Sequence, residues 1–403
     1  MKFAHLADCH IGAWRDPQLK ILMIDAFVNA ISTCIAKKVD FVLISGDLFN
    51  TALPGIDDLK MTVKHLRRLK DNDIPVYIIA GSHDYSPSGK TMIDVLEEVG
   101  LVTNVVKGTV HENKLQLKVF EDPKTKVKIA GMLGKRGQLE KAFYESLDIE
   151  KLEKEKGFKI FLFHSAIREL MPKEFALMEM QELSSLPKGW NYYAGGHIHI
   201  IKEHSEKNYS NVVYPGPLFP ASFSELEKLG NSGFFIYEDG KITREEINLK
   251  NIFRISIDAN HRSPEEVERE LNEKIAKKEF VNTIVLLKVF GVLKTGKVTD
   301  IHFREIFRSI YTQGAYFIVK STTKLLSSEF EEVKIDEKNL EEAEDAIIKE
   351  HLQQVKVTGL DKDKEYALIK KLLLAFEEEK HEGEKVYEYE DRMRKVGDKI
   401  LEL

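Results

Sequence analysis

The chain has 403 residues, of which 43% are hydrophobic and 31% are charged, a composition typical of a soluble globular protein with a large core and one or two smaller units. No apolar stretch near 18 residues stands out and no signal-peptide pattern comes before the first apolar run, so we expect neither a membrane span nor secretion. Two cysteines, Cys9 and Cys34, give no disulfide framework and fit a reducing cytoplasm.

Charge is spread unevenly along the chain. Residues 331–403 carry 22 acidic and 14 basic side chains, whereas the first 330 residues carry 44 acidic and 46 basic ones. The formal net charge of −6 therefore does not exclude a polyanionic substrate for the first part of the chain. It gives no positive argument for nucleic acid, because no dominant basic stripe is visible.

Short apolar runs alternate with helical stretches over residues 1–250. The runs that indicate buried strands are Phe3–Ala7, Phe41–Ile44, Val76–Ala80, Lys159–Phe163 and Tyr192–Ala194. Between the first and second strands, helical spacing predicts a helix with one face made of Ile21, Ile24, Phe27, Val28, Ile31 and Ile35. Between the second and third strands, it predicts a helix whose apolar face includes Leu59, Val63 and Leu66. This order predicts a layered α/β core with a partly parallel sheet.

A small α/β cap is predicted over residues 251–325. Its expected strands are Phe253–Ile257, Thr283–Val289 and Ala315–Val319, with a helix over Ile301–Tyr311. Ser263-Pro264-Glu265-Glu266 is a helix start, with Ser at the N-cap, Pro at the first position and Glu at the third. The apolar side chains of Val267, Leu271 and Ile275 follow at four-residue steps.

Residues 326–403 differ in composition, since Glu and Lys dominate and no proline occurs after Pro264. Three helices are predicted there, over Leu340–Leu352, Tyr366–Phe376 and Tyr387–Leu401. The middle one is too apolar for a short free helix in water, so it must pack on something. Packing on the other helices or the cap and docking of a partner protein are both consistent with this pattern.

A short polar cluster follows each of the five predicted strands. The clusters are Asp8-Cys9-His10, Ser45-Gly46-Asp47, Ser82-His83-Asp84, His164-Ser165 and His197-Ile198-His199. The carboxyl ends of strands in α/β sheets are where active sites form, so we expect the five clusters to meet. A single Asp-x-His pair or a lone His is a weak signal, but five such clusters in order indicate a metal site that activates water.

The mixture of imidazole and carboxylate ligands suits Mn²⁺, Fe or Zn²⁺. Two ions about 3.5–4 Å apart could share the carboxylate of Asp47, with an acidified water between them. Cys9 is better explained as a buried strand-end residue than as a ligand, because such a site prefers oxygen and imidazole.

His83 and Asp84 have a different expected task. The side chain of His83 should face the substrate, where its imidazole could stabilise the transition state or donate a proton to the leaving oxygen. Asp84 either orients His83 and raises its pKa or serves as a cap or loop charge, and the sequence favours neither.

These motifs resemble the calcineurin-like metallophosphoesterases, whose pattern is D-x-H, G-D, G-N-H-D/E, H and G-H-x-H. Within them, the chain is most similar to the Mre-eleven/SbcD family of DNA double-strand-break repair nucleases, in its archaeal form. The residues that carry this likeness are Ala7–Gly12, Ser45–Phe49, Gly196–His199 and the turn Tyr214–Pro217.

The resemblance implies a metallophosphoesterase sandwich that cleaves DNA ends with two Mn²⁺ ions. It implies one metal at Asp8, His10, Asp47 and His199 and another at Asp47, Ser82, His164 and His197, with His83 assisting cleavage. It further implies a homodimer, a DNA-contacting cap, and C-terminal helices that bind the coiled coil of an SMC-like ABC ATPase, Rad-fifty.

Two residues depart from the family pattern. Ser82 replaces the usual Asn, and its shorter side chain should weaken the second metal site. Asn50 stands where many members have a His tied to exonuclease action, so we expect reduced 3′–5′ exonuclease relative to endonuclease activity.

Residues that contact DNA are poorly determined by the sequence. Trp14, Arg15, Lys135 and Arg136 are candidates for phosphate contact, although solvated surface charge explains each of them more simply. Two other functions remain open: a phosphatase or phosphodiesterase for small substrates, and a DNA-end-binding scaffold with little catalysis.

Overall fold

The computed structural model describes residues 1–86, 89, 91–135, 139–172, 180–276 and 278–327. In the C-terminal part it describes residues 345, 348–349, 352, 361–376, 378, 381 and 386–401. The chain divides into two compact units, Met1–Leu326 and Ser327–Leu403.

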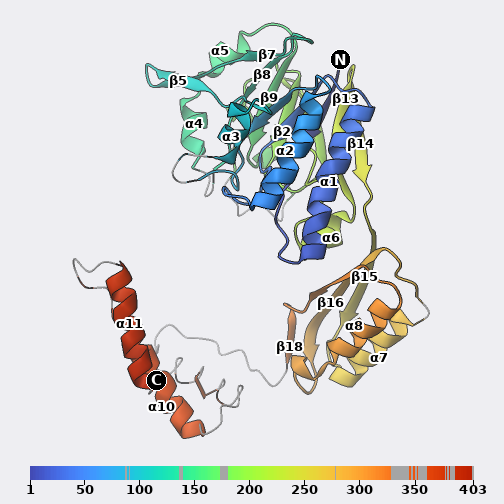
Figure 1. Ribbon diagram of the computed structural model, residues 1–403, viewed down its shortest axis with the longest axis vertical. Helices are drawn as coiled ribbons and strands as arrows, with labels where there is room; N and C mark the ends of the chain where they lie inside the picture. Colours follow the sequence, from blue (N-terminus) through green and yellow to red (C-terminus); the bar gives the residue numbers. More distant parts are fainter. Residues whose placement is uncertain are drawn as a thin grey trace. The chain divides into compact units, whose positions relative to one another are not determined.

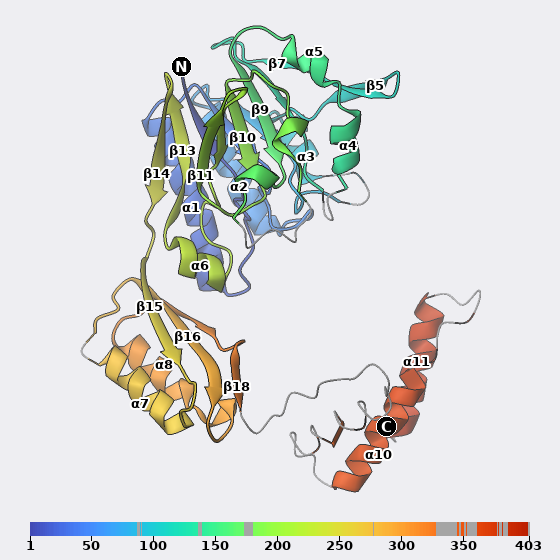
Figure 2. The ribbon, with the colours of Figure 1, turned by 180° about the vertical axis from the view of Figure 1, so that it is seen from behind.

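Two six-stranded sheets form the core of the first unit (Figures 1 and 2). The first sheet has the order β14 (Lys241–Ile247), β13 (Ser232–Glu238), β1 (Lys2–Leu6), β2 (Phe41–Ser45), β3 (Val76–Ile79) and β4 (Thr103–Asn104). The second has the order β11 (Lys202–Glu206), β12 (Tyr209–Tyr214), β10 (Tyr192–Gly196), β9 (Lys159–His164), β8 (Lys128–Gly131) and β7 (Phe120–Glu121). Strands β1 to β4 run parallel, as do β8, β9, β10 and β12, so the predicted α/β sandwich is confirmed.

Alternation along the strands explains the layers. Phe3 and Phe41 of the first sheet pack with Tyr192 of the second in the core between the sheets. Their neighbours Ala4 and Val42 face the opposite side and pack against the helices. The central strands therefore bury both faces, which explains why they appear in the sequence as continuous apolar runs.

Helices cover the outer faces of the sandwich. They are α1 (Pro17–Ala36), α2 (Ile56–Lys70), α3 (Met92–Glu98), α4 (Lys141–Ser146), α5 (Ile149–Glu153) and α6 (Phe223–Leu229). Figure 1 shows α1 and α2 side by side along the first sheet, and the two helices are in contact. The remaining short elements of this part are the hairpin β5 (Gly108–His111) and β6 (Lys114–Leu117) and the 3-10 helices Arg168–Leu170 and Leu183–Ser185.

Helix α1 corrects two expectations. With 20 residues and a mean hydropathy of 1.7 it is long and apolar enough to span a membrane, contrary to the prediction that no such stretch exists. The helix instead packs in the core, and its buried face is built on Leu19, Leu22, Met23, Ala26, Phe27, Ala30, Ile31 and Cys34. Ile21 was predicted on that face but is 54% exposed. The prediction weighed only the larger apolar side chains and ignored the alanines that form part of the buried face.

The predicted cap elements are present in the first unit. Strands β15 (Asn251–Asp258), β16 (Thr283–Leu293), β17 (Phe317–Ser321) and β18 (Leu325–Ser327) form a sheet with helices α7 (Pro264–Ile275) and α8 (Phe303–Thr312), and a 3-10 turn covers Val298–Asp300. Ser263 and Glu266 make the expected reciprocal cap of α7. Val267, Leu271 and Ile275 lie in its separate core.

The second unit contains α10 (Lys362–Phe376) and α11 (Val386–Leu401), close to two of the three predicted helices. These two helices contact each other. The third prediction, Leu340–Leu352, lies largely outside the described residues. Leu374 and Phe376 of α10 are more than half exposed, so the described part of this unit does not cover all of its apolar surface.

Candidate metal centre

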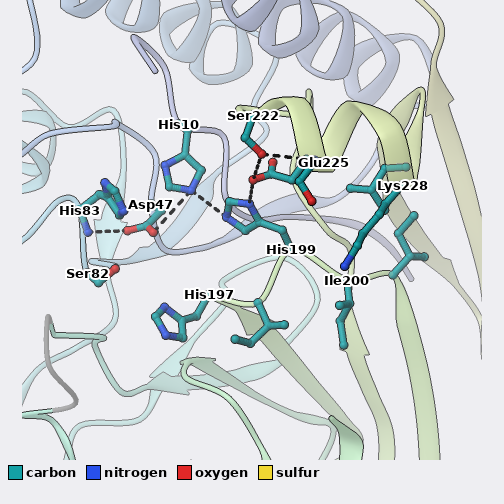
Figure 3. A pocket seen from close by; sticks show the side chains of 14 residues that line it. His10, Asp47, Ser82, His83, His197, His199, Ile200, Ser222, Glu225 and Lys228 are labelled. Atoms are coloured by element: carbon teal, nitrogen blue, oxygen red, sulfur yellow. Dashed lines mark hydrogen bonds and ion pairs between the residues drawn. The ribbon is translucent and has the colours of Figure 1, made fainter. Parts of the chain in front are cut away.

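The five polar clusters at the strand ends lie close together. The clusters around Asp8, Asp47 and Ser82 follow β1, β2 and β3 of the first sheet. His164 ends β9, and His197 follows β10 of the second sheet. Because β1, β2 and β3 run parallel to one another, as do β9 and β10, their carboxyl ends lie at one edge of each sheet, and both sheets contribute side chains to the site (Figure 3).

The backbone is bent sharply at these strand ends. Four residues of the clusters adopt left-handed φ angles: Asp8 at 49°, His10 at 42°, Asp47 at 51° and His197 at 89°. Non-glycine residues in this region are strained by about 1–3 kcal/mol each, and such strain concentrates at functional sites. A cluster of four supports a functional site here independently of the side-chain chemistry.

Glycines permit the close approach of the loops. Gly46 has a φ of +88°, and a Cβ there would lie 2.3 Å from Nδ1 of His164. A Cβ on Gly81 would lie 2.2 Å from Oδ1 of Asp47. Both positions therefore need a residue without a side chain.

Asp47 lies at the centre of the cluster. Its Oδ2 is 3.6 Å from Nε2 of His10 and 3.2 Å from Nε2 of His164. On one side, Nε2 of His10 lies 2.9 Å from Nε2 of His199, which is 3.8 Å from Oδ1 of Asp8. On the other side, the rings of His164 and His197 have centroids 5.1 Å apart.

The donor set fits a divalent metal ion. Three groups of ligand atoms each lie within 4.8 Å of one another: Asp8 with His10 and His199, Asp8 with Asp47 and His164, and His10 with Asp47 and His83. Ligands about 2.1 Å from one metal at right angles lie about 3 Å apart, close to the separation of the His10 and His199 nitrogens. Oδ2 of Asp8 is buried without a hydrogen-bond partner, and a bound cation would satisfy it.

Burial and neighbouring charges shift the pKa values of these side chains. Burial lowers the pKa of His10 to about 3 and that of His197 to about 4, so both rings are neutral and keep a lone pair for a metal. Burial also opposes charge on Asp47, but His164 and His10 outweigh it and hold the pKa of Asp47 below its usual range. The central carboxylate is therefore ionised.

His5 ties the two sheets together beneath the site. Its ring is fully buried, with Nδ1 3.0 Å from the hydroxyl of Tyr192 and Nε2 3.0 Å from the hydroxyl of Ser45. Burial lowers the pKa of His5 to about 3, so the ring bonds as a neutral group. This bridge fixes β2 immediately before the Gly46 turn that presents Asp47.

His83 lies at the edge of the cluster and lines the cleft. Its backbone N–H donates to Oδ1 of Asp47 at 2.8 Å, and its ring Nδ1 lies 2.8 Å from the carbonyl oxygen of Asn50. The Asn50 backbone therefore orients the His83 ring, with Nδ1 as donor and Nε2 available for a substrate.

Asp84 has a different place from the one expected if it oriented His83. Its carboxylate is buried and accepts hydrogen bonds from the backbone N–H groups of Leu48, Phe49 and Gly81 at 2.9–3.1 Å. These bonds join the loops after β2 and β3, which favours the alternative of a loop charge. Burial and the charge of Asp47 raise the pKa of Asp84 to about 7, although the three backbone donors oppose this shift.

The other candidates lie in different settings. Trp14 is half-buried and donates from its indole to the carbonyl of Pro220 at 3.0 Å, whereas Arg15 is exposed. Lys135 lies over the rings of Tyr85 and Phe143, and Arg136 is outside the described residues. The thiol of Cys9 is buried, and this burial raises its pKa, which disfavours a thiolate ligand.

A cleft of about 590 Å³ opens over the cluster, and some of its walls were not predicted from the sequence. Ser82, His83 and His197 line one part of it. Glu225 and Lys228 of α6 and the apolar side chains of Ile198, Ile200 and Ile201 line another. Glu225 contacts Nδ1 of His199 at 3.1 Å, and only the pattern Ser222-x-x-Glu225 signals in the sequence that a helix begins there.

The first part of the chain is similar to a family of known proteins. Residues 1–200 match the calcineurin-like phosphoesterase family model. The DNA double-strand break repair protein Mre11 of Methanococcus maripaludis is 27% identical over 388 residues, which are 93% of this chain and 95% of the relative.

Other archaeal proteins of the same name cover less of the chain. The Archaeoglobus fulgidus protein is 26% identical over 278 residues, covering 64% of this chain and 62% of its own length. The Sulfolobus acidocaldarius protein is 33% identical over 205 residues, covering 49% and 50%. Residues 1–200 are thus similar to the calcineurin-like phosphoesterases, and the chain resembles, over most of its length, the Mre11 proteins of DNA double-strand break repair.

Proposed function

We propose that this protein is a manganese-dependent DNA nuclease that processes double-strand breaks. The observation that carries the proposal is the convergence of Asp8, His10, Asp47, His164 and His199 on one cluster within a chain similar to Mre11 proteins. The match of residues 1–200 to the calcineurin-like phosphoesterases supports a metal-dependent phosphoesterase. The names of the relatives, which are DNA double-strand break repair proteins, support DNA as the substrate.

The proposed ligands divide around Asp47. Asp8, His10 and His199 would hold one Mn²⁺ with Asp47, and His164, His197 and Ser82 would hold the other. When bound, the ions would supply an acidified water and offset the charge that develops on the phosphate. Ser82 has a shorter side chain than the usual Asn, so the second ion would be bound less tightly than the first.

The other residues of the cleft would handle the substrate. His83, oriented by the carbonyl of Asn50, is placed to donate a proton to the leaving oxygen or to stabilise the transition state through Nε2. Lys228 lines the same cleft and provides a positive charge for a phosphate of the DNA backbone. The cleft can thus both hold and cleave a phosphodiester.

The balance between two nuclease activities depends on Asn50. Its side-chain amide does not ionise at neutral pH and cannot act as a general acid, so 3′–5′ exonuclease activity is reduced relative to endonuclease activity. Asn50→His, which leaves the backbone bond to His83 in place, is expected to raise resection of a 3′-labelled duplex. Unchanged resection would contradict this part of the proposal.

Partners follow from the same resemblance. The chain would act on DNA ends as a homodimer in the cytoplasm, with an SMC-like ABC ATPase of the Rad-fifty type on its C-terminal helices. The exposed Leu374 and Phe376 of α10 support a docking role for that helix. The domain limits 1–250, 251–325 and 326–403 are part of this proposal.

One assay separates this function from the other two. The purified chain is tested on plasmid and hairpin DNA, and on bis-p-nitrophenyl phosphate, with Mn²⁺ against Mg²⁺. The proposal predicts cleavage of both DNA forms that is faster with Mn²⁺. Turnover of the small ester alone would indicate a phosphodiesterase for small substrates, and tight binding of DNA ends without any turnover would indicate a scaffold.

A further inference from the structure

Glu225 is held rigidly at the start of α6. Ser222 is the N-cap of this helix, and its hydroxyl accepts the backbone N–H of Glu225 at 3.2 Å and donates to Oε1 of Glu225 at 3.1 Å. The backbone N–H of Ala221 donates to Oε2 at 2.9 Å. Both carboxylate oxygens are therefore oriented before any metal or substrate is considered.

The same carboxylate faces a proposed metal ligand. Oε1 of Glu225 lies 3.1 Å from Nδ1 of His199, while Nε2 of that ring points into the cluster with His10 and Asp8 (Figure 3). One imidazole nitrogen thus contacts the helix and the other contacts the metal centre. A carboxylate accepts the Nδ1 proton, which leaves the lone pair of Nε2 for a metal.

The surroundings of Glu225 agree with this geometry. Three groups surround this carboxylate: the ring of His199, the hydroxyl of Ser222 and the backbone N–H of Ala221. Each of the three can donate a hydrogen bond, which a carboxylate accepts. The side chains of Glu225 and His199 are about one-fifth exposed, which limits competition from bulk water for their contact.

We propose that Glu225 is a positioning residue that fixes the tautomer and the ring orientation of His199 for metal binding. This inference rests on the proposed metal centre. It adds to that centre a residue from outside the five strand-end clusters, carried by a helix that begins 24 residues after His199.

Two variants separate positioning from a purely structural role. Ser222→Ala removes the helix cap and one donor to Oε1 of Glu225 but keeps the carboxylate itself in the chain. Glu227→Ala removes a carboxylate of the same helix that contacts Nζ of Lys288 in the cap at 2.8 Å. Glu227 is the matched control, because it has the same charge and the same helix but a different partner.

The test is a calorimetric titration of the full chain with Mn²⁺ after treatment with a chelator. Glu225→Ala is expected to weaken the tighter site about 10- to 100-fold, the usual effect of removing such a carboxylate. Glu225→Gln, whose amide oxygen still accepts the proton, is expected to lose less than tenfold. Glu227→Ala is expected to bind Mn²⁺ as the parent does, whereas Ser222→Ala, which loosens the carboxylate of Glu225 without removing it, is expected to lose less affinity than Glu225→Ala.

Two results would overturn the inference in distinguishable ways. If the parent binds two Mn²⁺ ions and Glu225→Ala binds them equally well, Glu225 does not position His199 and the metal centre stands. If the parent binds no Mn²⁺, the proposed function fails and the inference fails with it. If Glu225→Ala does not fold in the presence of chelator, Glu225→Gln and Glu225→Asp are compared with the parent instead. Asp keeps the charge but is one methylene shorter. Mn²⁺ affinities of both variants equal to that of the parent would contradict positioning.

Discussion

His83 is the single residue on which cleavage should depend most. It contacts the cluster through its backbone, while its ring is oriented by Asn50, so changing the ring leaves the proposed ligands in place. His83→Gln is expected to slow cleavage of labelled duplex DNA by about 10²- to 10⁴-fold, the usual contribution of an acid–base group. Mn²⁺ affinity should be unchanged by calorimetry, and a variant that cleaves at the parental rate would exclude this role.

His164 predicts how metal binding depends on pH. Burial lowers the pKa of His164, but the charges of Asp47 and Asp8 outweigh it and raise the pKa well above its usual value. The ring is therefore protonated at pH 7 without metal, and Mn²⁺ must displace that proton. Affinity should rise with pH below this pKa, by up to about tenfold per pH unit for each proton released.

Calorimetry in buffers of different ionisation enthalpy measures the released protons directly. A binding enthalpy that changes with the buffer, together with tighter binding at pH 8 than at pH 6, is expected. The same Mn²⁺ affinity at both pH values would show that His164 is not a ligand that exchanges its proton for metal.

The sequence was informative about strand-end residues and much less so about residues that act across the fold. Asp8, Asp47 and His164 each follow an apolar run, so their meeting at one edge could be predicted from chain order alone. Glu225 could not be predicted in this way, since its contact with His199 depends on how α6 packs. The backbone carbonyl of Asn50 is equally invisible to a pattern of side chains.

At the level of elements, the turn after β2 controls the site. Gly46→Ala would strain the backbone at a φ of +88° and push a Cβ against His164. It is expected to lower the free energy of unfolding by at least the 1–3 kcal/mol or so that such strain costs, and to weaken Mn²⁺ binding. Urea unfolding and calorimetry measure the two effects.

Gly157→Ala is the control for this prediction. Gly157 has a φ of +93°, but a Cβ there meets nothing within 4 Å. It should therefore show the cost of strain without the loss of Mn²⁺. Equal stability and equal metal binding in both variants would show that the close approach of Gly46 to His164 has no consequence.

Element types were predictable where apolar spacing was regular, as in α7 with Val267, Leu271 and Ile275. The buried face of α1 was misplaced because alanines such as Ala26 and Ala30 form part of it, and the pattern weighed only larger side chains. The assignment of β1 and β9 to different sheets could not be predicted, since both are continuous apolar runs buried on two faces.

At the scale of the whole molecule, the C-terminal unit should be separable from the chemistry. Leu374→Glu combined with Phe376→Glu changes two side chains of α10 that are 66% and 52% exposed, so folding should be preserved. Copurification with a coiled-coil SMC-like ATPase is expected to be lost, while turnover of bis-p-nitrophenyl phosphate stays at the parental level. Retained copurification would show that this face of α10 is not the docking surface.

The central claim is that side chains from two sheets hold a pair of ions around Asp47. It is tested most directly by anomalous diffraction at the manganese edge from crystals grown with excess Mn²⁺. Two peaks about 3.5–4 Å apart are expected, one on each side of Asp47, with lower occupancy beside Ser82. An empty cleft, or a single ion that Asp47 does not contact, would contradict it.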